Sequence, residues 1–204
     1  MKNIKDLFNS DWQVKEYLKE YKQDDINLKI IKSLKPQTSV LSLGCGGGRE
    51  VKALLEQGHE VTAVDFAPNM IEQSKSLAPQ AKYLCADAIA FAKNYDVKFD
   101  YILGLHSFLN YIFKKDRKEL IANLIGMLNP GGELIFEVRF WNERFIDSMK
   151  ALLSYPFVEE FGDTYTRSGI GRLVLGHQYT LRQLKRLFSK YNYTLDRSIV
   201  RVKC

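Results

Sequence analysis

The sequence has few cysteines and no long run of apolar residues. Its three cysteines, Cys45, Cys85 and Cys204, lie far apart and form no Cys-x-x-Cys pair, which argues against a zinc site and against a disulfide framework. No stretch approaches the roughly 18 consecutive apolar residues of a membrane-spanning helix. The first residues mix charges throughout and lack the apolar centre of a signal peptide. We therefore expect a cytoplasmic protein with no membrane partner.

The sequence also lacks internal repeats, low-complexity segments and any cluster of metal-ligating residues, so we expect no bound metal. The net charge of +6 is moderate and comes from lysines and arginines that are spread along the chain. Their densest clusters, at 114–118 and 182–186, have the spacing of solvated helix faces. This charge permits a nucleic-acid partner but does not require one.

The composition, with 46% hydrophobic and 26% charged residues among 204, is ordinary for one globular domain. We expect a single domain over 1–204 made of four segments. These are an N-terminal helical lid at 1–35, a ligand-binding core at 38–140, an insertion at 141–178, and a C-terminal helix and strand at 179–204. The lid prediction competes with core packing of the aromatic residues Trp12, Tyr17 and Tyr21.

A dense group of glycines lies in the stretch SVLSLGCGGGRE at 39–50. Residues 40–43 predict a strand, the glycines at 44–48 predict a tight turn, and the residues from 49 onward resume with helical spacing. A strand, a glycine turn and a helix in this order are typical of a nucleotide-binding crossover. Cys45 stands where the turn needs a small residue, so it is either a steric filler or a reactive thiol.

Strands and helices alternate through the rest of the core. The pattern predicts strands at 40–43, 60–64, 81–86, 99–104 and 133–140, helices at 49–57, 68–77, 89–92 and 116–128, and a turn at 129–132. This order, with its short connections, predicts an α/β fold: a doubly wound, mostly parallel, Rossmann-like sheet with helices on both faces.

The segments outside this core are less regular. Residues 1–34 read as two helices, and 141–178 reads as a small antiparallel insertion after the fifth strand, with a helix and two or three strands. Thr180 caps a helix over 181–190, and 193–202 reads as one last strand.

Two aspartates end the second and third predicted strands. Because ligands of open α/β sheets bind outside the carboxyl ends of the strands, Gly44, Asp65 and Asp87 share one ligand-binding edge. The Asp65 carboxylate can accept hydrogen bonds from both hydroxyls of a ribose, and Asp87 can accept one from an adenine amino group. The alternative for each aspartate is that it caps the following helix.

Two apolar residues follow the first of these aspartates. Phe66 and Met70 can cover the two sides of a purine, and the alternative is that they pack in the core. A nicotinamide or flavin dinucleotide is a second candidate ligand for this edge. Its G-x-G-x-x-G fingerprint is not met, because the position three residues after Gly46 is Arg49.

Five segments of the core resemble the motifs of the class I S-adenosylmethionine-dependent methyltransferases, in the correct order and spacing. They are VLSLGCGGGRE at 40–50, VTAVDFAPNMIEQSK at 61–75, YLCADA at 83–88, FDYILGLHSFLNYI at 99–112 and LNPGGELIFEV at 128–138. The resemblance implies S-adenosyl-L-methionine as the cofactor. It implies cofactor contacts at Ser42, Gly44, Gly46, Gly48, Asp65, Phe66, Met70, Asp87, Ala88 and Leu105.

The chain departs from this family in two places. Ser42 stands where the family usually has an acidic residue that helps to hold the ammonium group of the cofactor. Serine accepts a hydrogen bond but brings no charge, so carbonyl groups near Gly44 and Leu105 would share that task. The family usually ends with two strands, whereas we expect only one at 193–202. A seventh strand is therefore missing, replaced by residues near 171–179, or cut off.

Candidates for the acceptor side follow the fourth and fifth strands. His106 could act as a general base, since its ordinary pKa is near neutral, and Tyr111 and Asn110 could orient a substrate. Structural roles are the alternative for each of them. Further candidates with structural alternatives are Trp141, Arg144 and His177 near the acceptor and Arg49 near the cofactor carboxylate or in solvent.

The resemblance implies direct displacement of a methyl group from a sulfonium onto a nucleophile. We expect a small-molecule acceptor, because the aromatic insertion suits an enclosed site, and a monomer or homodimer. The alternatives are methylation of RNA or protein, and a non-catalytic module that binds S-adenosylmethionine.

Overall fold

A computed structural model describes residues 26–140, 163–167 and 173–204 of the chain. The predicted lid before residue 26 therefore lies outside the described residues, as do the acceptor-side candidates Trp141 and Arg144. Within the described residues, no helix combines the length and the apolar character that a membrane crossing requires.

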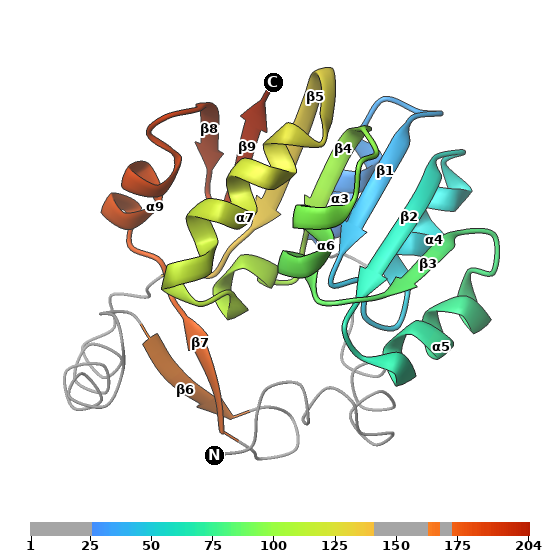
Figure 1. The fold of residues 1–204 in the computed structure, drawn as a ribbon, viewed down its shortest axis with the longest axis horizontal. Helices are drawn as coiled ribbons and strands as arrows, with labels where there is room; N and C mark the ends of the chain where they lie inside the picture. The colour runs from blue at the N-terminus through green and yellow to red at the C-terminus, as the bar shows by residue number, and fades with distance from the viewer. Residues whose placement is uncertain (1–25, 141–162, 168–172) are drawn as a thin grey trace.

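A seven-stranded sheet with the order β3-β2-β1-β4-β5-β9-β8 forms the centre of the molecule (Figure 1). Its strands are β1 (Ser39–Leu43), β2 (Glu60–Asp65), β3 (Lys82–Cys85), β4 (Phe99–Gly104), β5 (Leu128–Glu137), β8 (Asn192–Asp196) and β9 (Ile199–Lys203). The strands β1 to β5 pair in parallel, and β9 pairs antiparallel with both β5 and β8, so β8 runs in the same direction as β1 to β5. This mostly parallel α/β sheet confirms the predicted fold class.

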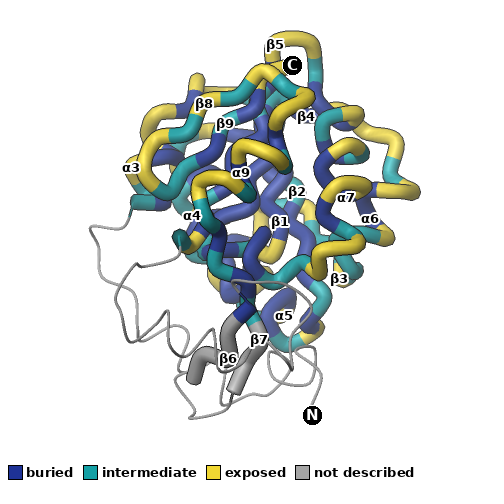
Figure 2. The backbone as a smooth tube through the Cα atoms, turned by 90° about the vertical axis from the view of Figure 1, so that its left-hand side faces the viewer, coloured by how far each residue is buried: buried dark blue, intermediate teal, exposed yellow. Residues whose placement is uncertain are grey.

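Helices cover both faces of this sheet. They are α3 (Ile26–Lys32), α4 (Arg49–Glu56), α5 (Pro68–Leu77), α6 (Ala88–Asn94), the short 3-10 helix η1 (Phe108–Tyr111), α7 (Lys114–Gly126) and α9 (Leu181–Phe188). The side chains of β1 alternate between the faces. Leu41 packs in a cluster with α6, α7 and α9, whereas Val40 packs in a second cluster with α3, α4 and α5. Figure 2 shows the central strands as the most buried part of the backbone.

Local signals set the ends of several helices. Pro68 occupies the first turn of α5, and Gly58, with φ of 79°, follows the end of α4. Thr180 and Gln183 form a capping box at the start of α9. These are the positions at which the sequence predicts the helices to begin or end.

The C-terminal prediction of one strand over 193–202 is wrong. The chain instead forms a hairpin, in which Asp196 pairs with Ile199 and Arg197 and Ser198 make the turn. Arg197 adopts φ of 50°, a conformation that few residues other than glycine take. Strand β9 inserts between β5 and β8, so the sheet has its seventh strand and residues 171–179 do not replace it.

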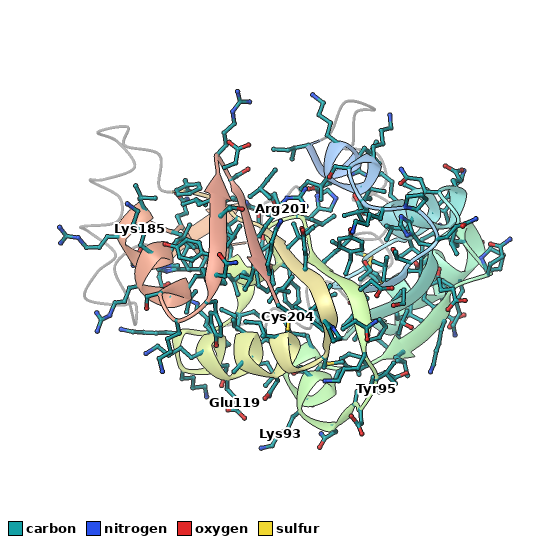
Figure 3. All side chains as sticks on the ribbon, turned by 90° about the horizontal axis from the view of Figure 1, so that it is seen from above. Lys93, Tyr95, Glu119, Lys185, Arg201 and Cys204 are labelled. Atoms are coloured by element: carbon teal, nitrogen blue, oxygen red, sulfur yellow. The ribbon has the colours of Figure 1, made fainter. Side chains whose placement is uncertain are left out.

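Side-chain contacts tie β9 to its neighbours. The Arg201 guanidinium donates to Glu133 on β5 and to the Ser33 hydroxyl beside α3. Figure 3 labels Arg201 on this last strand, with α3 nearby. The C-terminal strand is thus fixed both by the sheet and by the helical layer behind it.

β5 differs slightly from the sequence prediction, whereas the insertion agrees with it. Residues 129–132 form an irregularity within β5 instead of a separate turn, because Leu128 pairs with Phe99 and Glu133 already pairs with Tyr101. In the insertion, β6 (Asp163–Arg167) and β7 (Leu173–His177) form an antiparallel hairpin of their own. This hairpin confirms the predicted antiparallel strands there.

Candidate active site

The glycine turn connects β1 to α4 at the carboxyl edge of the sheet. Gly44, Gly46 and Gly48 all adopt positive φ, between 51° and 89°. A Cβ atom on Gly48 would lie 2.8 Å from the Ser74 Cα, so glycine at this position lets α5 pack against the turn. At Gly44 a Cβ atom would lie 2.9 Å from the Phe108 ring. The Phe108 ring, which follows β4, is therefore the close neighbour of Gly44.

Cys45 lies inside this turn with 5% of its surface exposed. Its backbone N–H donates to Val64 at the end of β2. Burial raises the pKa of the Cys45 thiol far above its ordinary value. A thiol that stays protonated is a poor nucleophile, so the geometry favours the steric role.

Asp65 joins β2 to the glycine turn. Its Oδ2 accepts from the Gly46 N–H and its Oδ1 accepts from the Ala67 N–H, both at 2.9 Å. The residue is 8% exposed, and this burial raises the pKa of its carboxyl although both N–H groups oppose the shift. Ala67, and not Asp65, occupies the N-cap position of α5. The structure therefore does not support the alternative that Asp65 caps α5.

Asp87 does act as a helix cap. Its Oδ1 accepts from the Ile89 and Ala90 N–H groups at 3.0 and 3.3 Å, at the start of α6. A further contact of Asp87 with an adenine, together with Ala88 beside it, remains a prediction. Met70 is 2% exposed and packs with Ala67 and Phe66 in a small cluster next to the turn.

Two further predicted cofactor residues are buried near the same edge. Ser42 on β1 is 5% exposed and has Ala63 and Leu103 as its neighbours in the adjacent strands. Leu105, directly after β4, is 6% exposed and packs with the α3–α4 cluster. Their contacts with a cofactor remain predictions.

His106 belongs to a charged network that the sequence analysis did not identify. Its Nε2 lies 2.5 Å from Oε1 of Glu50, and the same oxygen lies 2.5 Å from Nη2 of Arg49. Burial raises the pKa of Glu50, but the hydrogen bonds and charges of His106 and Arg49 outweigh it and hold the pKa below its ordinary value. The available signal was that Glu50 shares the inward face of α4 with Leu54, four residues later.

The turn after β4 has an unusual backbone. His106 and Ser107 both adopt positive φ, 50° and 60°. The Glu137 carboxylate at the end of β5 accepts from the Ser107 N–H at 2.5 Å, and Arg139 Nε donates to the Ser107 hydroxyl at 3.1 Å. Strained residues of this kind persist where the surroundings hold them, and they concentrate at functional sites.

Asn110 and Tyr111 lie one turn further along. The Asn110 amide bonds the backbone of Arg139 in both directions and donates to the carbonyl of His177. Asn110 therefore joins the residues after β5 to β7. These bonds favour a structural role for Asn110 over the orientation of a substrate. The Tyr111 hydroxyl accepts from Arg139 Nη2 at 3.0 Å, and its catalytic role remains a prediction.

His177 forms a buried pair with Asp163, a partner that the sequence analysis did not identify. Its Nδ1 lies 2.7 Å from Oδ1 of Asp163 across the β6–β7 hairpin, and the two residues are 1% and 7% exposed. The His177 ring also packs edge-on against Tyr179. These contacts favour a structural role for His177. Among the residues that the structure describes, no group of three or more His, Cys, Asp or Glu residues could hold a metal ion.

An open hollow of about 1000 Å³ adjoins the carboxyl end of β5. Its lining includes Glu137, Arg139, Phe140, Gln178, Leu181 and Arg197. Because Glu137 and Arg139 also hold Ser107, the hollow borders the turn that carries His106.

Comparison with known proteins gives a consistent result. A family model described as a methyltransferase domain matches residues 40–132. A malonyl-[acyl-carrier protein] O-methyltransferase of Anoxybacillus flavithermus is 37% identical over 106 residues, which cover 50% of this chain and 39% of that relative. A 2-methyl-6-phytyl-1,4-hydroquinone methyltransferase of Synechocystis sp. is 30% identical over 119 residues, which cover 55% of this chain and 35% of that relative. The chain thus spans less than half the length of these curated relatives.

The solved structure of an S-adenosylmethionine-bound amino pentose methyltransferase from Micromonospora echinaspora has the same fold. It aligns with a TM-score of 0.67 and 18% identity over 100% of this chain and 99% of that chain. At this identity the likeness shows the fold alone. Together with the family match, it supports the motif assignment. Residues 40–132 therefore match a methyltransferase domain, as the motifs predict, and the chain has the fold of an S-adenosylmethionine-bound methyltransferase.

Proposed function

We propose that this protein binds S-adenosylmethionine at the carboxyl edge of its sheet and transfers the methyl group to a small-molecule acceptor. The observation that carries the proposal is the buried Asp65 carboxylate, which is fixed by two backbone N–H groups beside the glycine turn. Each oxygen makes one such hydrogen bond, and a carboxylate oxygen can accept more than one. The ribose hydroxyls of the cofactor are donors of the kind that this acceptor fits.

The other proposed cofactor contacts surround Asp65. Gly44 is exposed and presents its backbone to the methionine portion, Gly46 is buried and fixes Asp65 through its N–H, and Ser42 contributes an uncharged acceptor below them. Phe66 and Met70 flank the adenine, while Asp87 keeps its capping bonds to α6 and lies at the end of the next strand. Asp65 thus supplies the main charged acceptor for the cofactor in this proposal.

The cofactor supplies an activated methyl group on a sulfonium, which leaves as a neutral thioether. The chain contributes alignment of the acceptor with that methyl group, exclusion of water and, where the acceptor must lose a proton, a base. His106 fits the role of base, since it follows β4 at the edge where the methyl group would lie. Tyr111 fits the role of an orienting residue.

The hollow beside β5 fits a small organic acceptor. Its volume of about 1000 Å³ is at the upper end of ordinary ligand pockets, and it combines apolar residues with Glu137, Arg139 and Arg197. The two curated relatives described above are named for a hydroquinone and for a malonyl group on a carrier protein. These names support an organic acceptor.

Two measurements on the intact chain test the proposal. Calorimetry with S-adenosylmethionine and S-adenosylhomocysteine should detect binding of both, and absence of binding would overturn the proposal. Transfer of a labelled methyl group to a library of small metabolites should then identify an acceptor, with bulk RNA and protein as comparison substrates. Transfer only to RNA or protein would overturn the acceptor class, and cofactor binding without any transfer would identify a non-catalytic module.

A further inference from the structure

A buried carboxylate on the first turn of α4 has no task in the proposed cofactor contacts. Glu50 is 5% exposed, although ionisable side chains are rarely buried without a reason. Its Oε1 lies 2.5 Å from both His106 Nε2 and Arg49 Nη2, and Arg49 Nε approaches the same oxygen at 3.1 Å. Glu50 therefore links the helix after the glycine turn to the turn after β4.

The short contact between Glu50 and His106 defines where the imidazole proton lies. The pKa of Glu50 is lowered, so its carboxylate is ionised at neutral pH and can only accept hydrogen bonds. An oxygen and a nitrogen that both presented lone pairs would repel each other at 2.5 Å. Arg49 Nη2 also lies 2.9 Å from Nε2, but it can direct its hydrogen at Oε1, as Nε2 can. The shorter contact with the carboxylate oxygen therefore puts the proton on Nε2, and in the neutral ring the lone pair belongs to Nδ1.

The backbone of His106 is held as firmly as its ring. His106 and Ser107 are consecutive residues with positive φ, which is a costly arrangement for side chains other than glycine. Glu50 holds the first residue through its ring, and Glu137 holds the second through its N–H and hydroxyl. Two carboxylates from different elements thus fix one short turn next to Phe108, whose ring lies close to Gly44.

From this geometry we propose that Glu50 is a positioning residue that holds His106 in the Nε2-protonated form, so that Nδ1 receives the proton of the methyl acceptor. The proposal rests on the proposed function and gives a role to a residue that is not among the cofactor contacts implied by the motifs. In the step, the lone pair of the acceptor forms the bond to the methyl carbon. The carbon–sulfur pair goes to sulfur, the acceptor proton goes to Nδ1, and it passes to water after the product leaves.

The roles of Arg49 and Glu50 follow from their charges. Arg49 balances the carboxylate, so the buried cluster is close to neutral while the ring is neutral. When the ring takes up a proton, the Glu50 charge stabilises the imidazolium that forms. His106 has 18% of its side chain exposed, which leaves a path for the proton to reach water.

The test uses the full chain, three glutamate variants and one variant of His106. Glu50→Leu removes the acceptor but suits the apolar neighbours Val51 and Leu54, and Glu50→Gln keeps the shape in case the leucine variant fails to fold. Glu56→Leu is the control, since Glu56 lies on the same helix but is exposed. Imidazole ¹⁵N signals should show one tautomer, protonated on Nε2, in the wild type and in Glu56→Leu. They should show a mixture in Glu50→Leu and an intermediate state in Glu50→Gln.

Binding of S-adenosylhomocysteine separates this proposal from the proposed function. Affinity should stay within about threefold in Glu50→Leu, while kcat with the acceptor found in the metabolite screen should fall about 100-fold or more. The acidic limb of the wild-type pH–rate profile, along which a general base must lose its proton before it can act, should be absent in His106→Asn. A mixed tautomer in the wild type, or unchanged kcat in both Glu50 variants, would overturn the positioning role even if the cofactor binds. Failure of the wild type to bind the cofactor would instead overturn the proposed function.

Discussion

Asp65 and Asp100 are partly or wholly buried aspartates at opposite ends of the parallel strands, and their surroundings act on them in opposite directions. Burial raises the pKa of Asp65, whereas hydrogen bonds from Asn129 and Ser39 lower the pKa of Asp100. The folded protein thus destabilises the charge of Asp65 and stabilises that of Asp100. A buried charge that is retained against its own cost is a candidate for ligand binding, while a stabilised one at the amino end of β4 serves the fold.

We predict that Asp65→Asn and Asp100→Asn have separable effects. Asp65→Asn should weaken S-adenosylhomocysteine binding at least tenfold, because a charge-assisted hydrogen bond contributes about 1.5–3 kcal/mol. It should also lower the stability of the free protein by about 1–3 kcal/mol, because the amide NH2 would face one of the two backbone N–H groups that the carboxylate accepts from. Asp100→Asn should cost about 1 kcal/mol of stability, since the site is partly exposed, and leave affinity unchanged. Calorimetry and urea unfolding measure the two quantities. Equal affinity losses in both variants would contradict the assignment of Asp65.

Acid sensitivity provides a second prediction for a single residue. The folded pKa of Glu50 lies below its ordinary value, so the unfolded chain takes up a proton first as the pH falls. The stability that the Glu50 carboxylate contributes is therefore complete above the unfolded pKa and is lost as the pH falls through the folded pKa. Between about pH 5 and pH 3, Glu50→Gln should lose less stability than the wild type, measured by urea unfolding at each pH. A parallel decline of both proteins would refute this contribution.

The sequence could identify Asp65 but not Glu50, and the reason is physical. Asp65 ends a regular strand next to a glycine turn, so topology alone assigns it to the ligand-binding edge. Glu50 looks like an ordinary acidic residue in the first turn of a helix, where the macrodipole favours it. Its burial and its contact with His106 depend on how α4 meets the turn after β4, which no local pattern encodes.

At the level of the elements, the glycine turn and α5 depend on one close contact. We predict that Gly48→Ala destabilises the protein by about 2–4 kcal/mol, because a Cβ atom would meet the Ser74 backbone and alanine resists φ of 89°. The control is Gly126→Ala at the end of α7, where no atom lies within 4 Å of the added Cβ. That variant should be neutral or gain up to about 1 kcal/mol. Urea unfolding compares them, and equal stabilities would show that the Gly48 contact is unimportant.

Most elements of the core could be predicted, because periodicity and capping residues agreed there. Pro68, Gly58 and Thr180 each marked a helix end that the structure has. The C-terminal hairpin could not be predicted, because Arg197 and Ser198 turn the chain without glycine, proline or asparagine. The prediction of a separate turn before β5 was wrong for the opposite reason. The strong turn signal Asn-Pro-Gly-Gly at 129–132 lies inside a strand that continues past it.

At the scale of the whole molecule, the sheet brings the candidate site together from distant parts of the chain. The glycine turn, Asp65, Asp87 and His106 come from four different strand ends, and parallel pairing puts all four on one edge. The strands β5, β9 and β8 continue the sheet sideways past β4. β5 carries Glu137, which holds the turn after β4, and β9 pairs with β5. The C-terminal hairpin therefore contributes to the site through the strand that it covers and through Arg197, which lines the hollow beside β5.

The last prediction concerns that hairpin. Removal of residues 199–204 should abolish cooperative folding, because it exposes the edge of β5 and deletes Val200 and Val202, which are at most 1% exposed. Each buried valine contributes about 1.5–3 kcal/mol, and the exposed edge invites aggregation, against a total stability of about 5–15 kcal/mol for a domain. Removal of Cys204 alone is the control, and it should lower the midpoint of thermal unfolding only slightly, since only one backbone hydrogen bond to Gly132 is lost. Soluble yield and thermal unfolding measure both truncations. A soluble 1–198 chain that unfolds cooperatively would mean that β5 is stable as an edge strand, and that the antiparallel end of the sheet is an addition to the methyltransferase core, not a requirement for it.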